Sequence, residues 1–304
     1  MTMTEIEIEA PGPNGPLRGT LLSGNAMKLP PVLIIPGSGP TDRDGNNPLG
    51  VRASTYRLLA EGLAAEGIPT LRVDKRGLFG SAAAIPDADA VTIGDYAGDV
   101  HVWNVILRER TGAPCAWLLG HSEGGLVALA AAKNAADLCG LILVAAPGRR
   151  LGDILREQLR ANPANAPILA EAQRVIDALE AGRRVDGARL HPALLPLFRP
   201  EVQGFLIDAL ALDPAKLIAG FPKPVLVLQP GSDLQVSRTN AERLKAAKPG
   251  AELHVSPGTS HVLKHVGSDD PAANLATYGA IDLPLAPDII PTVAAFIRAH
   301  ASDT

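Results

Sequence analysis

The sequence has few cysteines, no excess of basic residues and no long hydrophobic run. Its 304 residues include only two cysteines, Cys115 and Cys139, and both lie in or beside apolar segments. A free cysteine in such a segment usually behaves as a small buried hydrophobic residue, and a disulfide between the two is the alternative. We therefore expect free, buried cysteines with no catalytic role.

Charge and hydropathy exclude further classes of protein. The net charge is −4 and the pI is about 6.0, so we expect no basic surface for nucleic acid or an anionic membrane. No apolar run approaches the roughly 18 residues of a membrane-spanning helix. The segment MTMTEIEIEA lacks the basic and apolar parts of a signal peptide. We expect a soluble, cytoplasmic protein that binds neither nucleic acid nor membranes.

The chain has the composition of a globular protein, with 46% hydrophobic and 20% charged residues. EIEIEA and LRGTLLS flank a turn rich in proline and glycine, and their alternation predicts an antiparallel hairpin. Short apolar runs then predict strands buried on both faces, at residues 31–36, 69–74, 116–120, 141–145 and 225–229, with a last strand at 252–256. Helical patterns lie at residues 56–66, 96–109, 125–136, 241–247 and 287–300. This alternation predicts a mostly parallel sheet with helices on both faces.

One long segment interrupts the alternation. About eighty residues between the strands at 141–145 and 225–229 carry helical patterns and no strand-like run. A connection of that length inside a compact domain is usually functional or separately structured. We interpret residues 148–220 as a helical lid inserted between two parts of the core, residues 1–147 and 221–304. A single long crossover with surface helices is the alternative.

A G-x-S-x-G motif follows one of the predicted strands. Gly120-His121-Ser122-Glu123-Gly124 lies between AWLLG and the helical GGLVALAAAKNAA. This strand, turn and helix context distinguishes a nucleophile elbow from a chance match. The outer glycines are needed because a Cβ there would collide with the neighbouring strand and helix. Ser122 is therefore the candidate nucleophile, His121 is expected to point its ring away from it, and a plain Gly/Ser turn is the alternative.

A serine hydroxyl needs a general base and a group that orients the base. Asp233 and His261 each follow a predicted strand, which gives the chain order serine, acid, histidine expected after this motif. Neighbouring parallel strands lie about 5 Å apart, so their carboxyl ends can bring the two side chains together. We predict that Asp233 orients His261, which takes the proton of Ser122. Asp213 is the alternative acid.

Backbone N–H groups are expected to bind the oxyanion of a tetrahedral intermediate. One belongs to Glu123, the residue after the nucleophile, and the second to the loop PGSGPTDRDGN. In that loop we nominate the N–H of Ser38, with Gly39 next. The loop lacks the G-K-[ST] ending of a phosphate-binding loop.

The remaining polar clusters predict structure rather than chemistry. We interpret the charged residues 42–44 as a local salt-bridge cluster, with a substrate contact by Arg43 as the alternative. The strand-end sequence DKRG at 74–77 is interpreted as fixing loops. His261 and His265 have the spacing of zinc ligands on a helix, but no glutamate accompanies them and the lysine beside His265 would repel a cation. No metal and no cofactor is expected.

The motifs GHSEGG, PGSGPTDRDGN, DKRG, PGSDLQVS and GTSHVLK together resemble those of bacterial α/β-hydrolases with carboxylesterase activity, often described as serine aminopeptidase-like or acyl-thioester-hydrolase-like. The resemblance runs from Pro31 to the C-terminal helix. It implies an α/β-hydrolase fold and an acyl-serine mechanism without cofactor, with Ser122, Asp233 and His261 at the matching positions. The Leu-Phe pair at 78–79 departs from the family pattern, and we consider it a candidate for lining the pocket.

These residues predict a serine hydrolase of the carboxylesterase type. It would cleave short- to medium-chain carboxylic esters, and a small acyl compound is the only partner that we expect. The same residues serve amide, thioester or carbon–carbon bond hydrolysis, so these reactions stay open. A ligand-binding protein without turnover is the alternative of a different class, and the complete triad argues against it.

Overall fold

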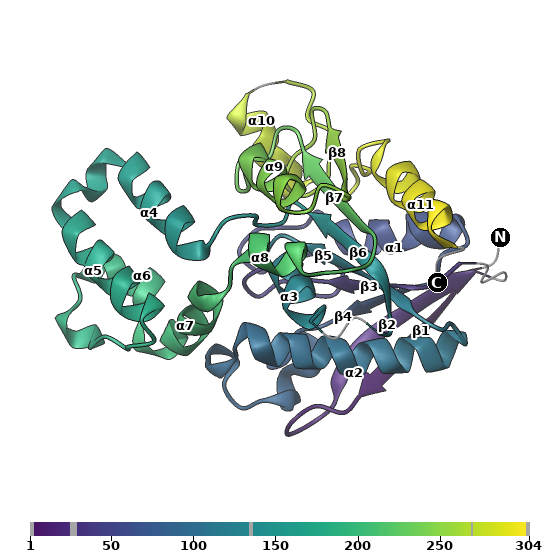
Figure 1. The fold of residues 1–304 in the computed structure, drawn as a ribbon, viewed down its shortest axis with the longest axis horizontal. Helices are drawn as coiled ribbons and strands as arrows, with labels where there is room; N and C mark the ends of the chain where they lie inside the picture. Colours follow the sequence, from purple (N-terminus) through teal and green to yellow (C-terminus); the bar gives the residue numbers. More distant parts are fainter. Residues whose placement is uncertain (1–2, 25–28, 134–135, 269, 302–304) are drawn as a thin grey trace.

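The computed structural model describes residues 3–24, 29–133, 136–268 and 270–301 (Figure 1). Eight strands form one sheet in the order β1-β2-β4-β3-β5-β6-β7-β8. The predicted hairpin pairs β1 with β2, which runs antiparallel to β4, and all other neighbours are parallel. The strands are β1 (Met3–Ala10), β2 (Leu17–Gly24), β3 (Val32–Ile35), β4 (Thr70–Val73), β5 (Ala116–His121), β6 (Leu138–Val144), β7 (Val225–Pro230) and β8 (Glu252–Ser256).

Helices cover both faces of the sheet, as predicted. On one face lie α1 (Thr55–Ala65) and α11 (Ile289–Ala299), and on the other lie α2 (Ile93–Thr111), α3 (Glu123–Ala131) and α9 (Arg238–Ala247). Every residue of β3, β4, β5, β6 and β7 is buried, because side chains on both faces of these strands pack against helices. The end of the helix predicted at 125–136 includes residues 134–135, which lie outside the described residues. A short helix, α10 (Pro271–Ala276), was not predicted.

Only helices and turns fill the interval between β6 and β7. They are α4 (Leu151–Ala161), α5 (Leu169–Glu180), α6 (Leu195–Phe198), α7 (Gln203–Ala211) and α8 (Pro214–Ala219), with short 3-10 turns between them. Helices α4 to α7 project to one side of the sheet (Figure 1) and share an apolar core that includes Leu155, Ile176 and Phe198. We call residues 148–220 the lid segment. None of the described helices is long and apolar enough to cross a lipid bilayer.

The expectation of free cysteines is wrong. Cys115 and Cys139 form a disulfide, with their Cα atoms 5.2 Å apart. Cys115 precedes β5 and Cys139 lies in β6, and the parallel pairing of these strands brings the two residues close together. The sequence indicated two buried positions, but strand pairing is what makes the bond possible.

Candidate active site

Ser122 lies on a sharp turn between β5 and α3. Its φ of 54° and ψ of −125° form a combination that L-amino acids rarely adopt. A Cβ at Gly120 would lie 2.2 Å from the carbonyl oxygen of Gly124, and a Cβ at Gly124 would lie 2.3 Å from that of Ile35. Both glycines are therefore required by close backbone contacts, one to the following helix and one to β3, as the motif predicted.

Asp233 and His261 meet at the carboxyl ends of β7 and β8. His261 Nδ1 lies 2.8 Å from Asp233 Oδ2, and the two side chains are 6% and 1% exposed. The other carboxylate oxygen of Asp233 accepts the backbone N–H groups of Gln235 at 2.7 Å and Val236 at 2.9 Å. These bonds fix the carboxylate and so the imidazole. Asp213, the alternative acid, instead caps α8 by accepting the N–H of Lys216.

Ser122 and His261 line the same cavity of about 260 Å³. Because Nδ1 is bonded to Asp233, Nε2 is the ring nitrogen that remains for Ser122. Among the described residues no hydrogen bond joins Ser122 Oγ to His261 Nε2. Such bonds are often long without substrate and tighten only in the complex.

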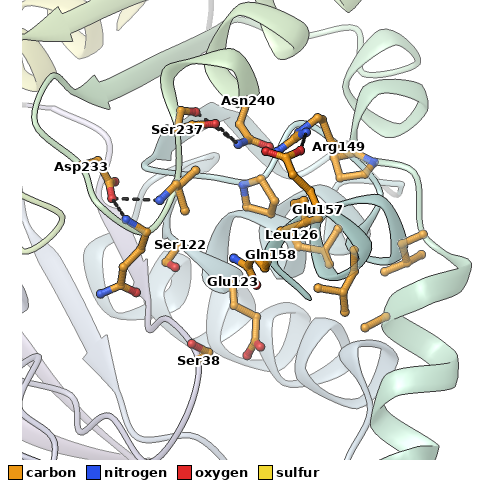
Figure 2. A pocket seen from close by; sticks show the side chains of 18 of the residues that line it. Ser38, Ser122, Glu123, Leu126, Arg149, Glu157, Gln158, Asp233, Ser237 and Asn240 are labelled. Atoms are coloured by element: carbon orange, nitrogen blue, oxygen red, sulfur yellow. Dashed lines mark hydrogen bonds and ion pairs between the residues drawn. The ribbon is translucent and has the colours of Figure 1, made fainter. Parts of the chain in front are cut away.

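Ser38 and Glu123 line a larger cavity of about 610 Å³ between the core and the lid segment (Figure 2). Neither of their backbone N–H groups donates to another described residue, so both are available to a ligand. Gly39, the second nomination in the loop, lines neither cavity beside Ser122. The pairing of Ser38 with Glu123 stays a prediction for the oxyanion site.

Lys75 holds the loop that carries Ser38, in agreement with the interpretation of DKRG as fixing loops, although the loop that it binds was not predicted. Its Nζ donates to the carbonyl oxygens of Gly37 at 2.7 Å and Gly39 at 2.6 Å. In a trans peptide the C=O and the following N–H point in opposite directions. Fixing the Gly37 carbonyl toward Lys75 therefore turns the Ser38 N–H away from it. Burial lowers the pKa of Lys75, and the nearby Glu123 carboxylate opposes that shift.

A second connection that the sequence did not reveal runs through His121 and Tyr56. His121 Nε2 lies 2.9 Å from the carbonyl oxygen of His261 and must donate to it, because a carbonyl only accepts. Burial lowers the pKa of His121 to about 3, so the ring is neutral and Nδ1 accepts the Tyr56 hydroxyl at 3.0 Å. Tyr56 in turn accepts the N–H of Gly37. The chain of bonds ties the loop of Ser38 to the backbone of His261.

The charged residues of the loop do not form the local cluster that was predicted. Arg43 binds Asp74 and Glu7, while Asp44 pairs with Arg72. These partners lie on β1 and at or near β4, so the loop is anchored to the sheet rather than to itself. Arg43 lines neither cavity beside Ser122, and the same is true of the Leu-Phe pair at 78–79. No local pattern in the sequence indicates these long-range partners.

Comparison with known proteins identifies the family. The sequence model of the alpha/beta hydrolase family matches residues 32–277, which include all the residues of the candidate site. The chain belongs to the alpha/beta hydrolase family. A comparison with curated proteins found none that matches this hydrolase.

Solved structures of several enzymes share the fold of the hydrolase at low identity. An esterase from Thermogutta terrifontis is 19% identical with a TM-score of 0.58, covering 98% of this chain and 99% of that chain. A proline iminopeptidase from Mycobacterium smegmatis is 17% identical with a TM-score of 0.61, and it also covers 98% of this chain and 99% of that chain. A bromoperoxidase from Bacillus anthracis is 14% identical with a TM-score of 0.56, covering 96% and 100%. At such identities the likeness establishes the fold alone.

Proposed function

We propose that this hydrolase cleaves short- to medium-chain carboxylic esters through an acyl intermediate on Ser122. The observation that carries the proposal is the hydrogen bond between Asp233 and His261 in a buried setting, beside a serine held on a strained turn. A neutral imidazole oriented in this way leaves Nε2 as a base toward the cavity that it shares with Ser122.

The proposed reaction begins when Ser122 Oγ attacks the ester carbonyl carbon and its proton passes to His261 Nε2. The carbonyl oxygen becomes an oxyanion that accepts the N–H groups of Ser38 and Glu123. The tetrahedral intermediate collapses, His261 returns the proton to the leaving alcohol, and the acyl group stays on Ser122. Water then repeats the sequence and releases the acid. Asp233 stays ionised throughout and stabilises the imidazolium.

The larger cavity supports an ester with an aliphatic acyl group as the substrate. Its volume of about 610 Å³ is within the usual range of small-molecule sites, and aliphatic and aromatic side chains from the core and the lid segment form much of its wall. We propose that the lid segment covers the site and shapes this cavity. The lid contributes Ile154 and Phe205, which line the cavity together with the core residue Leu126.

A covalent label tests the nucleophile directly. A fluorophosphonate should modify Ser122, and Ser122→Ala should remove both the label and the hydrolysis of nitrophenyl butanoate, with a fall in kcat on the order of 10⁴-fold or more. Ser237→Ala is the matched control, because Ser237 lines the same cavity but is not on the elbow. An active, unlabelled Ser122→Ala variant would exclude the proposal. Absence of both labelling and turnover in the wild type would favour a ligand-binding protein.

A further inference from the structure

Ser122 lies where two cavities of different size meet. The larger, of about 610 Å³, extends under the lid segment, and the smaller, of about 260 Å³, extends toward α1 and the loop after β3. Both are lined by Ser38, Ser122 and Gln235. A substrate attacked by Ser122 therefore has two separate places for the two sides of its scissile bond.

The proton donor assigns the leaving group to the smaller cavity. Of these two cavities, His261 lines only the smaller one. In the proposed reaction its Nε2 protonates the departing oxygen, which requires that oxygen to lie within hydrogen-bonding distance of the ring. The alcohol must therefore leave through the cavity that His261 lines.

The positions of the oxyanion donors place the acyl chain in the larger cavity. Glu123 lines only the larger of the two cavities, and Ser38 lines both. With the carbonyl oxygen held by these N–H groups and the leaving oxygen at His261, the third substituent of the carbonyl carbon points into the larger cavity. Figure 2 shows this space between Ser38, Glu123 and Leu126, and its wall includes Ile154, Phe205 and other apolar side chains.

The far part of the larger cavity is polar. Arg149 and Glu157 form an ion pair there, and Asn240 and Ser237 lie beside it (Figure 2). An alkyl chain gains free energy for each methylene that it buries among apolar side chains, and loses it where it must cover a charged pair. The chain that fits best therefore ends before this pair, which favours a medium length.

Polar groups line part of the smaller cavity. They include Thr41, Asn47 and the hydroxyl of Tyr278, which accepts a hydrogen bond from Gln235 Nε2 at 2.8 Å. Because that hydroxyl accepts from Gln235, its own proton is left to donate into the cavity. A long alkyl alcohol would remove these groups from water without giving them a partner.

We propose that the substrates are esters of a medium-length aliphatic acid with a small alcohol that carries a second oxygen. The acyl chain occupies the cavity under the lid segment, and the alcohol occupies the smaller cavity, where its second oxygen accepts a hydrogen bond from the hydroxyl of Tyr278. This assignment rests on the proposed ester hydrolysis at Ser122 and adds the class of substrate.

A pair of isomeric esters tests which cavity binds the acyl chain. Methyl nonanoate and octyl acetate share one molecular formula and differ only in which side of the ester bears the chain. With each buried methylene worth about fourfold in binding, kcat/KM for methyl nonanoate should exceed that for octyl acetate by about tenfold or more. Equal rates, or a preference for octyl acetate, would overturn the assignment.

A second pair of esters tests the hydrogen bond to the alcohol in the smaller cavity. 2-Hydroxyethyl nonanoate and propyl nonanoate have nearly the same shape, and the first should have the higher kcat/KM, by about fivefold, for one added hydrogen bond. Tyr278→Phe should lower kcat/KM for 2-hydroxyethyl nonanoate more than for propyl nonanoate, and so remove most of that difference. A wild-type enzyme that favours the propyl ester would contradict the proposal.

Two bulky substitutions provide matched controls at half-buried positions, one in each cavity. Ile154→Trp should lower kcat/KM for methyl nonanoate relative to methyl acetate, whereas Val51→Trp should lower it for 2-hydroxyethyl nonanoate relative to methyl nonanoate. The opposite pattern would exchange the two assignments. If nitrophenyl acetate is cleaved and Ser122 is labelled but no nonanoate ester is cleaved, this inference fails and the proposed function stands. If Ser122 is not labelled at all, the proposed function itself fails.

Discussion

Lys75 and Gly37 are joined by a buried hydrogen bond of 2.7 Å that holds the backbone beside Ser122. The ammonium group also binds the carbonyl of Gly39, so one side chain from the end of β4 fixes two peptides of the loop after β3. The orientation of the Ser38 N–H depends on these bonds, although Lys75 lines neither cavity beside Ser122.

Replacing Lys75 by methionine should therefore impair catalysis without direct loss of a substrate contact. We expect kcat to fall by about 10- to 100-fold, somewhat less than the loss of an oxyanion donor itself, with KM little changed. The affinity of the variant for a boronic acid that mimics the tetrahedral intermediate should fall by the same factor as kcat. Lys133→Met, at an exposed position, is the control for loss of a lysine. Equal changes in kcat and KM would indicate general damage to the fold.

The two candidate acids are distinguished by what each carboxylate binds. Asp233→Asn should lower kcat by roughly 10⁴-fold, because an amide that keeps its bonds to Gln235 and Val236 can present its NH₂ to His261 and favour the wrong tautomer. Asp213→Asn should preserve activity and change the free energy of unfolding by less than about 1 kcal/mol, since asparagine also caps helices. Steady-state kinetics of both variants is the measurement. If Asp213→Asn instead loses most of its activity, the acid is Asp213 rather than Asp233.

His121 should make the folded protein sensitive to acid. Its pKa is about 3 in the folded state against an ordinary value of 6.5, so between these pH values the unfolded chain binds more protons than the folded one. Stability then falls as the pH decreases from 6.5 toward 3, by up to roughly 4 kcal/mol from this residue. The neighbouring His261 would, if protonated, resist charging of His121 further, while Asp233 acts in the opposite direction.

Urea unfolding at several pH values measures this effect. In His121→Gln the amide can donate to the His261 carbonyl and accept from Tyr56, but it cannot be protonated. The variant should therefore show a shallower decrease in the free energy of unfolding between pH 6.5 and pH 4, with carboxylates accounting for what remains. Parallel curves for the two proteins would show that His121 does not charge on unfolding.

The disulfide between Cys115 and Cys139 should stabilise the core. It closes a loop with a sequence separation of 24 residues, for which a chain-entropy argument gives about 3 kcal/mol. Reduction should lower the Tm of the wild type and leave the double variant Cys115→Ala/Cys139→Ala unchanged. A thiol titration of the unfolded, unreduced protein should find no free thiol. Reactive thiols there would mean that the bond is absent, as expected for a reducing compartment such as the cytoplasm.

Most of the fold could be predicted because its determinants are local. Runs such as VLII and LCGLILV are apolar at every position because these strands are buried on both faces. The hairpin EIEIEA to LRGTLLS alternates because its outer strand is not buried on both faces. Ser122 could be identified for the same reason, because its turn requires glycine at fixed neighbouring positions. The whole motif therefore lies within five consecutive residues.

Such local patterns could not predict contacts between distant segments. Lysine in DKRG and histidine in GHSEGG have no local feature that says what they bind, and their partners are backbone carbonyls, which every residue carries. The disulfide likewise depends on the pairing of β5 with β6, and the ion pairs of Arg43 depend on where β1 and β4 lie.

The sequence by itself determined the alternation of strands and helices, and it placed Ser122, Asp233 and His261 in turns and loops that follow strands. Each of these features depends on the residues of one short segment. Only the tertiary structure decided that Ser122 lines two cavities and which buried groups hold the loop of Ser38. Those relationships arise when segments far apart in the chain pack together, and packing geometry depends on all of the partners at once rather than on any short run of residues.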